Sequence, residues 1–152
     1  MDLDVLIVRD PRESPHKCSL VPLRDFPGVR FVNYRRGLEL DVGTRILLDP
    51  EGEEIGPADR GLGLLVLDSS WKHLAELRRV VRGDLRPRRL PPLVTAYPRK
   101  SKVFADPSNG LASIEALYAA VALLDRPRPE LLTHYRWAPE FLARNAELLP
   151  RA

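Results

Sequence analysis

Residues 62–81 read LGLLVLDSSWKHLAELRRVV, and the order of the patterns within this stretch decides the fold class. Leu62 to Leu67 is a short apolar run typical of a buried strand, and it stops at a polar Asp-Ser-Ser turn. Ser70 is suited to cap a helix. Apolar side chains recur behind it at helical spacing, at Trp71, Leu74, Leu77 and Val81. A strand that passes directly into a helix indicates an α/β sheet.

Three further apolar runs upstream predict strands, at Leu3 to Val8, Val29 to Asn33 and Thr44 to Leu48. The last run is followed by Asp49-Pro50-Glu51-Gly52, which predicts a turn because proline presets φ and glycine permits a positive φ. We therefore expect the first part of the chain to form a small β-rich lobe.

Prolines divide the chain beyond residue 81. Pro87, Pro91 and Pro92 are expected to end the helix and to open a proline-rich connection, with one more strand at Leu93 to Thr95. Three helices are expected to close the chain, the second at Glu130 to Tyr135 and the third starting near Pro139. Their expected core residues are Ile114, Leu117, Tyr118, Val121 and Leu124 in the first, and Phe141, Leu142, Leu148 and Leu149 in the third.

The composition is that of an ordinary globular domain. The chain has 152 residues, of which 44% are hydrophobic and 30% charged, and this length suffices for one domain with its own core. The one cysteine, Cys18, excludes an internal disulfide and a multi-thiolate zinc site. No apolar run reaches the roughly 20 residues of a membrane helix, and residues 1–4 lack the features of a signal peptide. We therefore expect a cytoplasmic protein without a membrane partner.

The charge is distributed unevenly, although the net charge is only +3. Residues 37–68 hold eight acids and two bases, whereas residues 78–102 hold nine bases and one acid. Most of these bases are arginines, whose planar guanidinium pairs bidentately with phosphate. The patch predicts an RNA-binding surface, and a solvated arginine-rich surface is the alternative. The predicted RNA-binding residues are Arg78, Arg79, Arg82, Arg86, Arg88, Arg89, Arg99, Lys100 and Lys102.

Conventional catalytic and metal-binding signatures are missing from the sequence. The three histidines lie far apart without ligand spacing, so no metal site is expected. Asp68 and Trp71 follow a strand, and in open α/β sheets ligands bind beyond the carboxyl ends of strands. A carboxylate there can orient a reacting group, and an indole can stack on a base or hold a sulfonium. The alternative is a helix-capping aspartate beside a core tryptophan.

Five segments, taken in order, resemble motifs of the small-subunit rRNA aminocarboxypropyltransferase family, which is related to the DTW-domain tRNA aminocarboxypropyltransferases. The segments are Asp10-Pro11 with Lys17-Cys18-Ser19, Leu48-Asp49-Pro50-Glu51-Gly52 with Gly56-Pro57-Ala58-Asp59-Arg60, Val66-Leu67-Asp68-Ser69-Ser70-Trp71, Arg89-Leu90-Pro91-Pro92-Leu93, and Leu111-Ala112-Ser113-Ile114-Glu115-Ala116. The tail from Arg136 to Asn145 is similar to a further motif of the family. The resemblance therefore covers nearly the whole chain.

The resemblance implies an α/β protein with a small N-terminal lobe at residues 1–60. It also implies a SPOUT-like, knotted cofactor-binding lobe with C-terminal helices at residues 61–152. The implied reaction moves the aminocarboxypropyl group of S-adenosyl-L-methionine to a uridine or pseudouridine in structured RNA and releases methylthioadenosine. The implied substrate is rRNA rather than tRNA. We also expect a monomer.

The family's site residues carry over to positions of this sequence. The implied cofactor-binding residues are Ser19, Leu67, Leu90, Asn109 and Ser113. Asp68 is implied to orient or deprotonate the uridine imide, and Trp71 to hold the cofactor side chain or the base. Two alternatives stay open: a SPOUT-type RNA methyltransferase, and a non-catalytic RNA-binding or ribosome-assembly module. The presence of Asp68, Trp71 and Ser113 argues against the second, since a pure binding module needs only the arginine patch.

Overall fold

A five-stranded parallel sheet forms the centre of the computed structural model, which describes residues 3–12, 19–70, 72–98 and 111–151. The strands lie in the order β2-β1-β4-β3-β5, and every neighbouring pair runs parallel. Their bounds are β1 (Val5–Arg9), β2 (Val29–Asn33), β3 (Leu40–Glu54), β4 (Gly63–Asp68) and β5 (Val81–Arg89). The predicted α/β class is thereby confirmed.

Strand β1 shows how the sheet divides the core into two layers. Val5 and Ile7 pack with one hydrophobic cluster, whereas Leu6 and Val8 pack with the other, because successive side chains of a strand point to opposite faces. Both faces of the central strands are covered, and parallel strands that are buried on both faces carry continuous apolar runs. The run VLIVR of β1 is buried along its whole length.

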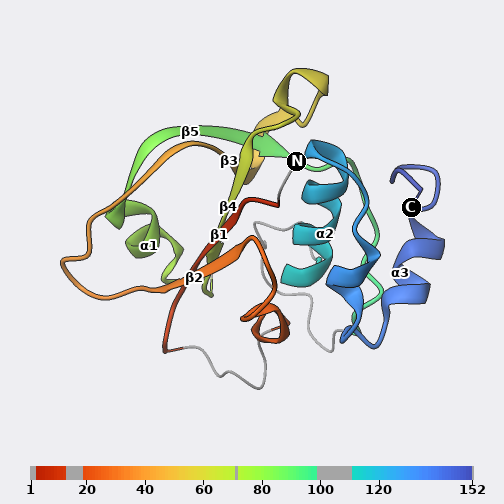
Figure 1. Cartoon of the computed structure of the whole chain (residues 1–152), viewed down its shortest axis with the longest axis horizontal. Coiled ribbons are helices and arrows are strands. Elements are labelled where there is room, and N and C mark those ends of the chain that lie inside the picture. Colours follow the sequence, from red (N-terminus) through yellow and green to blue (C-terminus); the bar gives the residue numbers. More distant parts are fainter. Residues whose placement is uncertain (1–2, 13–18, 71, 99–110, 152) are drawn as a thin grey trace.

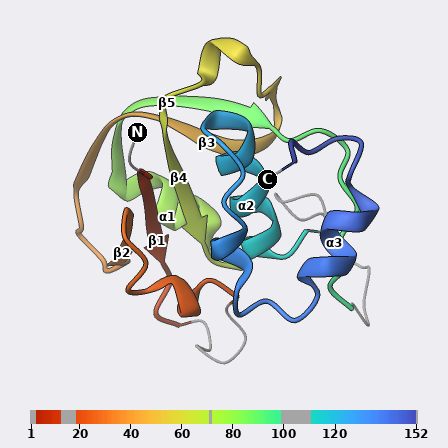
Figure 2. The same cartoon turned by 45° about the vertical axis from the view of Figure 1, so that its right-hand side comes forward.

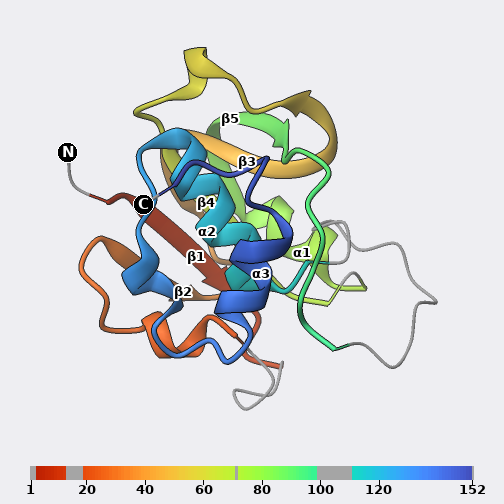
Figure 3. The ribbon, with the colours of Figure 1, turned by 90° about the vertical axis from the view of Figure 1, so that its right-hand side faces the viewer.

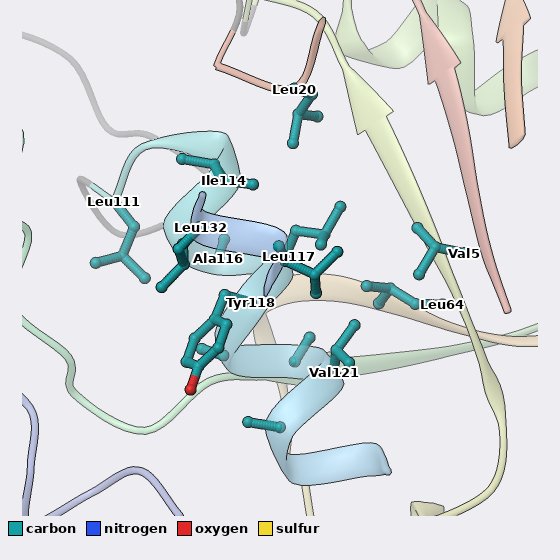
Figure 4. Close-up of a cluster of buried hydrophobic side chains, with 14 of the residues drawn as sticks. Val5, Leu20, Leu64, Leu111, Ile114, Ala116, Leu117, Tyr118, Val121 and Leu132 are labelled. Carbon is teal, nitrogen blue, oxygen red and sulfur yellow. The ribbon is translucent and has the colours of Figure 1, made fainter. Parts of the chain in front are cut away.

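Each face of the sheet is covered by a different helix. α1 (Leu74–Val80) packs on one face through Leu77 and Val80. α2 (Ser113–Leu124) packs on the other, where Leu117 and Val121 face Val5 of β1 and Leu64 of β4 (Figure 4). Figure 1 shows the two helices on opposite sides of β1 and β4. The five core residues predicted for the first C-terminal helix are all buried in α2, as expected.

The rest of the chain adds short helices and an outer layer on the α2 side. The short 3-10 helices are η2 (Val21–Leu23), η3 (Pro57–Asp59) and η4 (Pro129–Leu132). The last helix is α3 (Ala138–Arg144), and segment 91–98 runs beside it in Figures 2 and 3. Asn145 joins the two, because its side-chain amide binds both the N–H and the carbonyl of Val94, at 2.7 and 2.8 Å.

Several predicted elements differ from the observed ones. The predicted proline-rich connection at Pro87 is strand β5, since an edge strand tolerates a residue that lacks an N–H. Leu93–Thr95 is not a strand, because Val94 bonds to a side-chain amide rather than to a neighbouring strand. Glu130–Tyr135 holds only the 3-10 turn η4. Leu148 is 43% exposed rather than buried, whereas Leu149, which also lies beyond the end of α3, is buried as predicted.

The expected division into two lobes at residue 60 remains a prediction. Strands from both sides of that residue share the one sheet, since β1 pairs with β4 over Val5↔Leu64 to Arg9↔Asp68. None of the described helices is long and apolar enough to cross a membrane.

Candidate active site

The carboxyl ends of β1 and β4 form the switch point of the sheet. The chain leaves β1 toward β2 at one edge, whereas it leaves β4 through α1 toward β5 at the other. Ligands of open α/β sheets bind in the crevice that such diverging connections leave. Asp68 is the last residue of β4 and lies here, opposite Arg9 in the register of the two strands.

The side chain of Asp68 is only 13% exposed, and its carboxylate lies 4.0 Å from Nε of Arg9, which is itself 5% exposed. An ion pair in such a setting interacts more strongly than the same pair in water. α1 begins at Leu74 with His73 at its N-cap position, so Asp68 belongs to the strand and not to the cap of that helix. The capping alternative therefore does not hold for Asp68, and its role in the reaction stays a prediction.

A second carboxylate, Asp10, lies beside Asp68 and is fully buried. The N–H of Asp10 donates to the carbonyl of Asp68 at 2.9 Å, and the Asp10 carboxylate accepts the hydroxyl of Ser69 at 3.0 Å. Asp10 thus holds the turn that follows β4 through both its backbone and its side chain. Sequence reasoning did not single out Asp10 as a site residue, although the first family-like motif contains it.

Arg12 completes the environment of Asp10. Its backbone N–H and guanidinium donate three hydrogen bonds of 2.8 to 3.0 Å to the Asp10 carboxylate. Burial alone would raise the pKa of Asp10, but the hydrogen bonds from Arg12 and Ser69 outweigh it and hold this pKa below its ordinary value. The Asp10 carboxylate therefore stays ionised beside the crevice.

Arg12 also ties the end of β1 to helix α1. Its guanidinium lies 3.1 Å from the Glu76 carboxylate and 5.5 Å from the centre of the Tyr34 ring. The hydrogen bond from Arg12 lowers the pKa of Glu76, and His73 lies 3.5 Å from the same carboxylate. The loops at the switch point are therefore fixed to one another by charged groups.

The first turn of α2 brings two predicted cofactor-binding residues together. Ser113 is the first residue of the helix, and the hydroxyl of Ser19 accepts the N–H of Ile114 at 3.0 Å. This contact joins parts of the chain that are 95 residues apart. In Figure 1 the start of α2 lies at the same end of the molecule as the carboxyl end of β4.

The predicted residues Leu67 and Leu90 lie where the sheet opens. β4 pairs with β3 only from Arg45↔Gly63 to Leu47↔Leu65, and so leaves β3 before Leu67. β3 continues beside β5 to Glu54↔Arg89, directly before Leu90. The predicted residues Asn109 and Trp71 lie outside the described residues, as do Arg99, Lys100 and Lys102.

The predicted RNA-binding arginines that the structure describes gather along one edge of the sheet. β5 is an edge strand, and α1 leads directly into it. The exposed members are Arg78, Arg79, Arg82 and Arg89, whereas Arg86 and Arg88 are half-buried. Arg86 pairs with Asp84 at 3.2 Å, and Arg88 pairs with Asp59 at 3.1 Å.

Asp59 shows that Arg88 has a structural partner. Burial would raise the pKa of Asp59, but the hydrogen bonds from the Gly56 N–H and the Arg88 guanidinium hold it below its ordinary value. The arginines of this edge therefore differ in how available they are to bind RNA. Those of α1 and the start of β5 face solvent, whereas Arg88 is paired with a buried carboxylate. Among the described residues, no group of three or more His, Cys, Asp and Glu side chains is placed to hold a metal ion.

Comparison with known proteins gives one consistent result. The family model described as "Ribosome biogenesis protein, C-terminal" matches residues 46–151. A protein of Vulcanisaeta distributa named 16S rRNA aminocarboxypropyltransferase is 31% identical over 97% of this chain and 80% of its own length. A protein of Methanopyrus kandleri with the same name is 32% identical over 88% of this chain and 75% of its own length.

A solved structure supports the same relationship. The SAM-dependent rRNA:acp-transferase Tsr3 from Vulcanisaeta distributa superposes on this chain with a TM-score of 0.72 at 30% identity. The superposition covers 97% of this chain and 80% of that one. The arrangement of the parallel sheet and its helices is therefore shared with an enzyme of known class.

Proposed function

This chain belongs to the 16S rRNA aminocarboxypropyltransferase family, and we propose that it modifies a uridine or pseudouridine of the small-subunit rRNA at the carboxyl ends of β1 and β4. S-adenosyl-L-methionine supplies the aminocarboxypropyl group: a ring nitrogen of the base bonds to the methylene carbon next to the sulfonium, the bond from that carbon to sulfur breaks, and methylthioadenosine leaves. The observation that carries this proposal is the largely buried carboxylate of Asp68, which is 13% exposed and lies at the switch point of a sheet shared with a SAM-dependent rRNA:acp-transferase.

Asp68 is proposed to accept or orient the imide proton that the ring nitrogen loses. A positioned carboxylate contributes typically 10²–10⁴-fold to such a proton transfer. Asp10 supports this role, because its contacts with the carbonyl of Asp68 and with Ser69 fix where β4 ends. Trp71 follows this turn in the sequence, and we propose that it holds the cofactor side chain or the base.

The proposed cofactor-binding residues that the structure describes offer hydrogen-bond donors suited to S-adenosyl-L-methionine. The hydroxyl of Ser19 accepts the Ile114 N–H, so its own hydrogen remains a donor for a carboxylate such as that of the methionine part. Ser113 lies at the N-terminal end of α2, where a helix favours negative charge. Leu67 and Leu90 lie where β4 separates from the paired strands β3 and β5, and backbone groups there are suited to hydrogen-bond the edge of an adenine. Asn109 completes the proposed cofactor-binding set.

The basic edge at α1 and β5 is proposed to bind the phosphates of the rRNA. Support comes from the exposed Arg78 and Arg79 at the end of α1 and the exposed Arg82 and Arg89 of the edge strand β5, into which α1 leads directly. Such contacts position the RNA without reading its sequence. Arg99, Lys100 and Lys102 follow in the sequence and are proposed to extend this surface.

The finer features that the resemblance implies belong to the same proposal. These are the SPOUT-like knot, the lobes at residues 1–60 and 61–152 and rRNA rather than tRNA as substrate. The expected monomer and the cytoplasmic location expected from the composition are proposed with them. The support for the topology is the parallel order of the sheet and its likeness to a solved relative.

Analysis of the reaction products tests the proposal. The chain is incubated with S-adenosyl-L-methionine and unmodified small-subunit rRNA, and the small molecules and RNA nucleosides are identified by mass spectrometry. Release of methylthioadenosine with one aminocarboxypropyl group on the RNA is expected. S-adenosylhomocysteine would indicate a methyltransferase instead, and RNA binding with neither product would indicate a non-catalytic module.

A further inference from the structure

Glu115 is a fully buried carboxylate that the proposed reaction does not use. It belongs to the first turn of α2, directly after the Ser113–Ile114 pair that meets Ser19. A buried carboxylate is unfavourable unless hydrogen bonds compensate for its lost hydration. The hydrogen-bond partners of Glu115 therefore indicate its role in the fold.

Four donors satisfy Glu115, two at each carboxylate oxygen. Oε1 accepts the Ala112 N–H at 2.8 Å and the Thr95 hydroxyl at 2.6 Å. Oε2 accepts the Ala96 N–H at 2.9 Å and the Tyr135 hydroxyl at 2.9 Å. One side chain thus joins three parts of the chain: the start of α2, segment 95–96 and the stretch that precedes α3.

Only one of these four bonds is needed to cap the helix. The bond to the Ala112 N–H is half of a capping box, and an exposed glutamate makes it equally well. The bonds to Thr95 and Ala96 reach a segment that leads from Leu90, whereas the bond to Ala112 fixes the turn that carries Ser113. Glu115 therefore sets the position of two proposed cofactor-binding elements relative to each other.

We propose that Glu115 is a positioning residue of the cofactor site, which holds the first turn of α2 against segment 95–96. This inference rests on the proposed function, because it takes Ser113 and Leu90 as cofactor contacts. Ser19 holds the same turn from a distant part of the chain, through Ile114. The turn is thereby fixed from two sides before any ligand binds, and such preorganisation strengthens binding by reducing what must be ordered.

The variant Glu115→Gln tests the proposal with almost no change in volume. The hydroxyls of Thr95 and Tyr135 can rotate and accept a hydrogen bond from the new amide, but a backbone N–H can only donate. If the amide nitrogen replaces Oε1 it faces the Ala112 N–H, and if it replaces Oε2 it faces the Ala96 N–H. Either orientation releases one of the two elements.

The variant Asn145→Asp is the matched control. It is also an isosteric exchange at a buried position, and it disturbs the same outer segment at Val94, where the Asn145 amide donates to the Val94 carbonyl. The side chain of Asn145 bonds to Val94 and Phe141, which lie outside the first turn of α2. Both variants are expected to lower the melting temperature, and only Glu115→Gln is expected to weaken cofactor binding.

Isothermal titration and steady-state kinetics give the readouts. For Glu115→Gln we expect the Kd of S-adenosyl-L-methionine and of methylthioadenosine to rise about tenfold. The KM for S-adenosyl-L-methionine should rise by a similar factor, with kcat at saturating cofactor within about threefold of wild type. For Asn145→Asp the Kd should stay within about twofold of wild type. An unchanged Kd in Glu115→Gln, or an equal rise in both variants, overturns the proposal.

Two further measurements keep the test decisive. If Glu115→Gln fails to fold, Thr95→Val removes the hydroxyl donor of segment 95–96 and leaves both backbone bonds to Glu115, and a smaller rise in Kd of about two- to threefold is expected. An unchanged Kd in Thr95→Val then overturns the proposal. Failure of the wild type to bind the cofactor would instead refute the proposed function, so the two failures are distinguishable.

Discussion

At the scale of single residues, Asp10 is a fully buried group whose charge state contributes to the stability of the fold. Its folded pKa is lowered, so its contribution is fully present above about pH 4, the ordinary pKa of aspartate, and is lost as the pH falls further. In Asp10→Asn we expect the free energy of unfolding to be about 1–3 kcal/mol lower at neutral pH, because Arg12 loses its buried partner. The difference from wild type should shrink below pH 4 in denaturant titrations.

The exposed Asp25 provides the control for this prediction. Asp25→Asn removes the same charge at the surface, and its effect should stay within about 0.5 kcal/mol across the pH range. A difference between wild type and Asp10→Asn that persists unchanged at pH 3 would show that packing, and not the ionised carboxylate, is what the substitution removes.

Asp68 is the residue whose loss should affect the chemical step. In Asp68→Asn, which keeps the shape of the side chain, we expect the single-turnover rate at saturating cofactor to fall at least about 100-fold. Cofactor affinity should remain close to that of wild type. Asp84→Asn, the same change at an exposed residue of β5, should leave the rate unaffected. A rate for Asp68→Asn within a few-fold of wild type would remove Asp68 from the mechanism.

At the scale of elements, the end of α1 and the start of β5 form the part of the basic edge that is available to RNA. Replacing the exposed Arg78 and Arg79 by alanine should reduce the slope of log affinity against log salt by about 0.7–0.9 for each phosphate that the protein no longer neutralises. Arg88→Ala should change that slope little and should lower stability instead, because Arg88 pairs with the buried Asp59. Filter-binding titrations at several salt concentrations measure the slopes, and equal slopes in all variants would place the RNA elsewhere.

The elements that the sequence predicted well are those whose burial leaves a pattern. β1, β2, β4 and α2 carry continuous or periodic apolar runs and were found within a few residues of their observed bounds. β5 was missed because an edge strand needs neither alternation nor a full set of N–H donors, so Pro87 misled the prediction. The segment at Leu93–Thr95 was misread because its partner is the Asn145 amide, which no local pattern reveals.

The same reason explains which candidate site residues the sequence could single out. Asp68 was singled out because it directly ends an apolar strand; the structure places it at the end of β4, and its role in the reaction stays a prediction. Asp10 and Glu115 were not singled out, because their significance lies in partners far away in the sequence, such as Ser69 for Asp10 and Thr95 for Glu115. Only the assembled fold brings those partners together.

At the scale of the whole molecule, the shared sheet predicts that cofactor binding stabilises the whole chain against unfolding. Strands from both parts pair across residue 60, so thermal unfolding should be a single transition. S-adenosyl-L-methionine at 100 times its Kd should stabilise the chain by about 2.7 kcal/mol, visible as a rise in melting temperature. An unchanged melting temperature in the presence of S-adenosyl-L-methionine would contradict this expectation. So would two separate unfolding transitions of which only one shifts when the cofactor is added.

The position of β1 in the sheet has a consequence for how the chain folds during translation. β1 is made before the other four strands of the sheet, but it lies between β2 and β4, and the partner β4 spans Gly63–Asp68. Until that strand leaves the exit tunnel, one edge of a strand that is wholly buried in the finished fold is open to foreign strands. Parallel pairing across such sequence distances is slow to form. We expect the nascent chain to depend on chaperones during this interval, and pausing translation shortly before residue 63 should increase aggregation, whereas pausing beyond residue 130 should not.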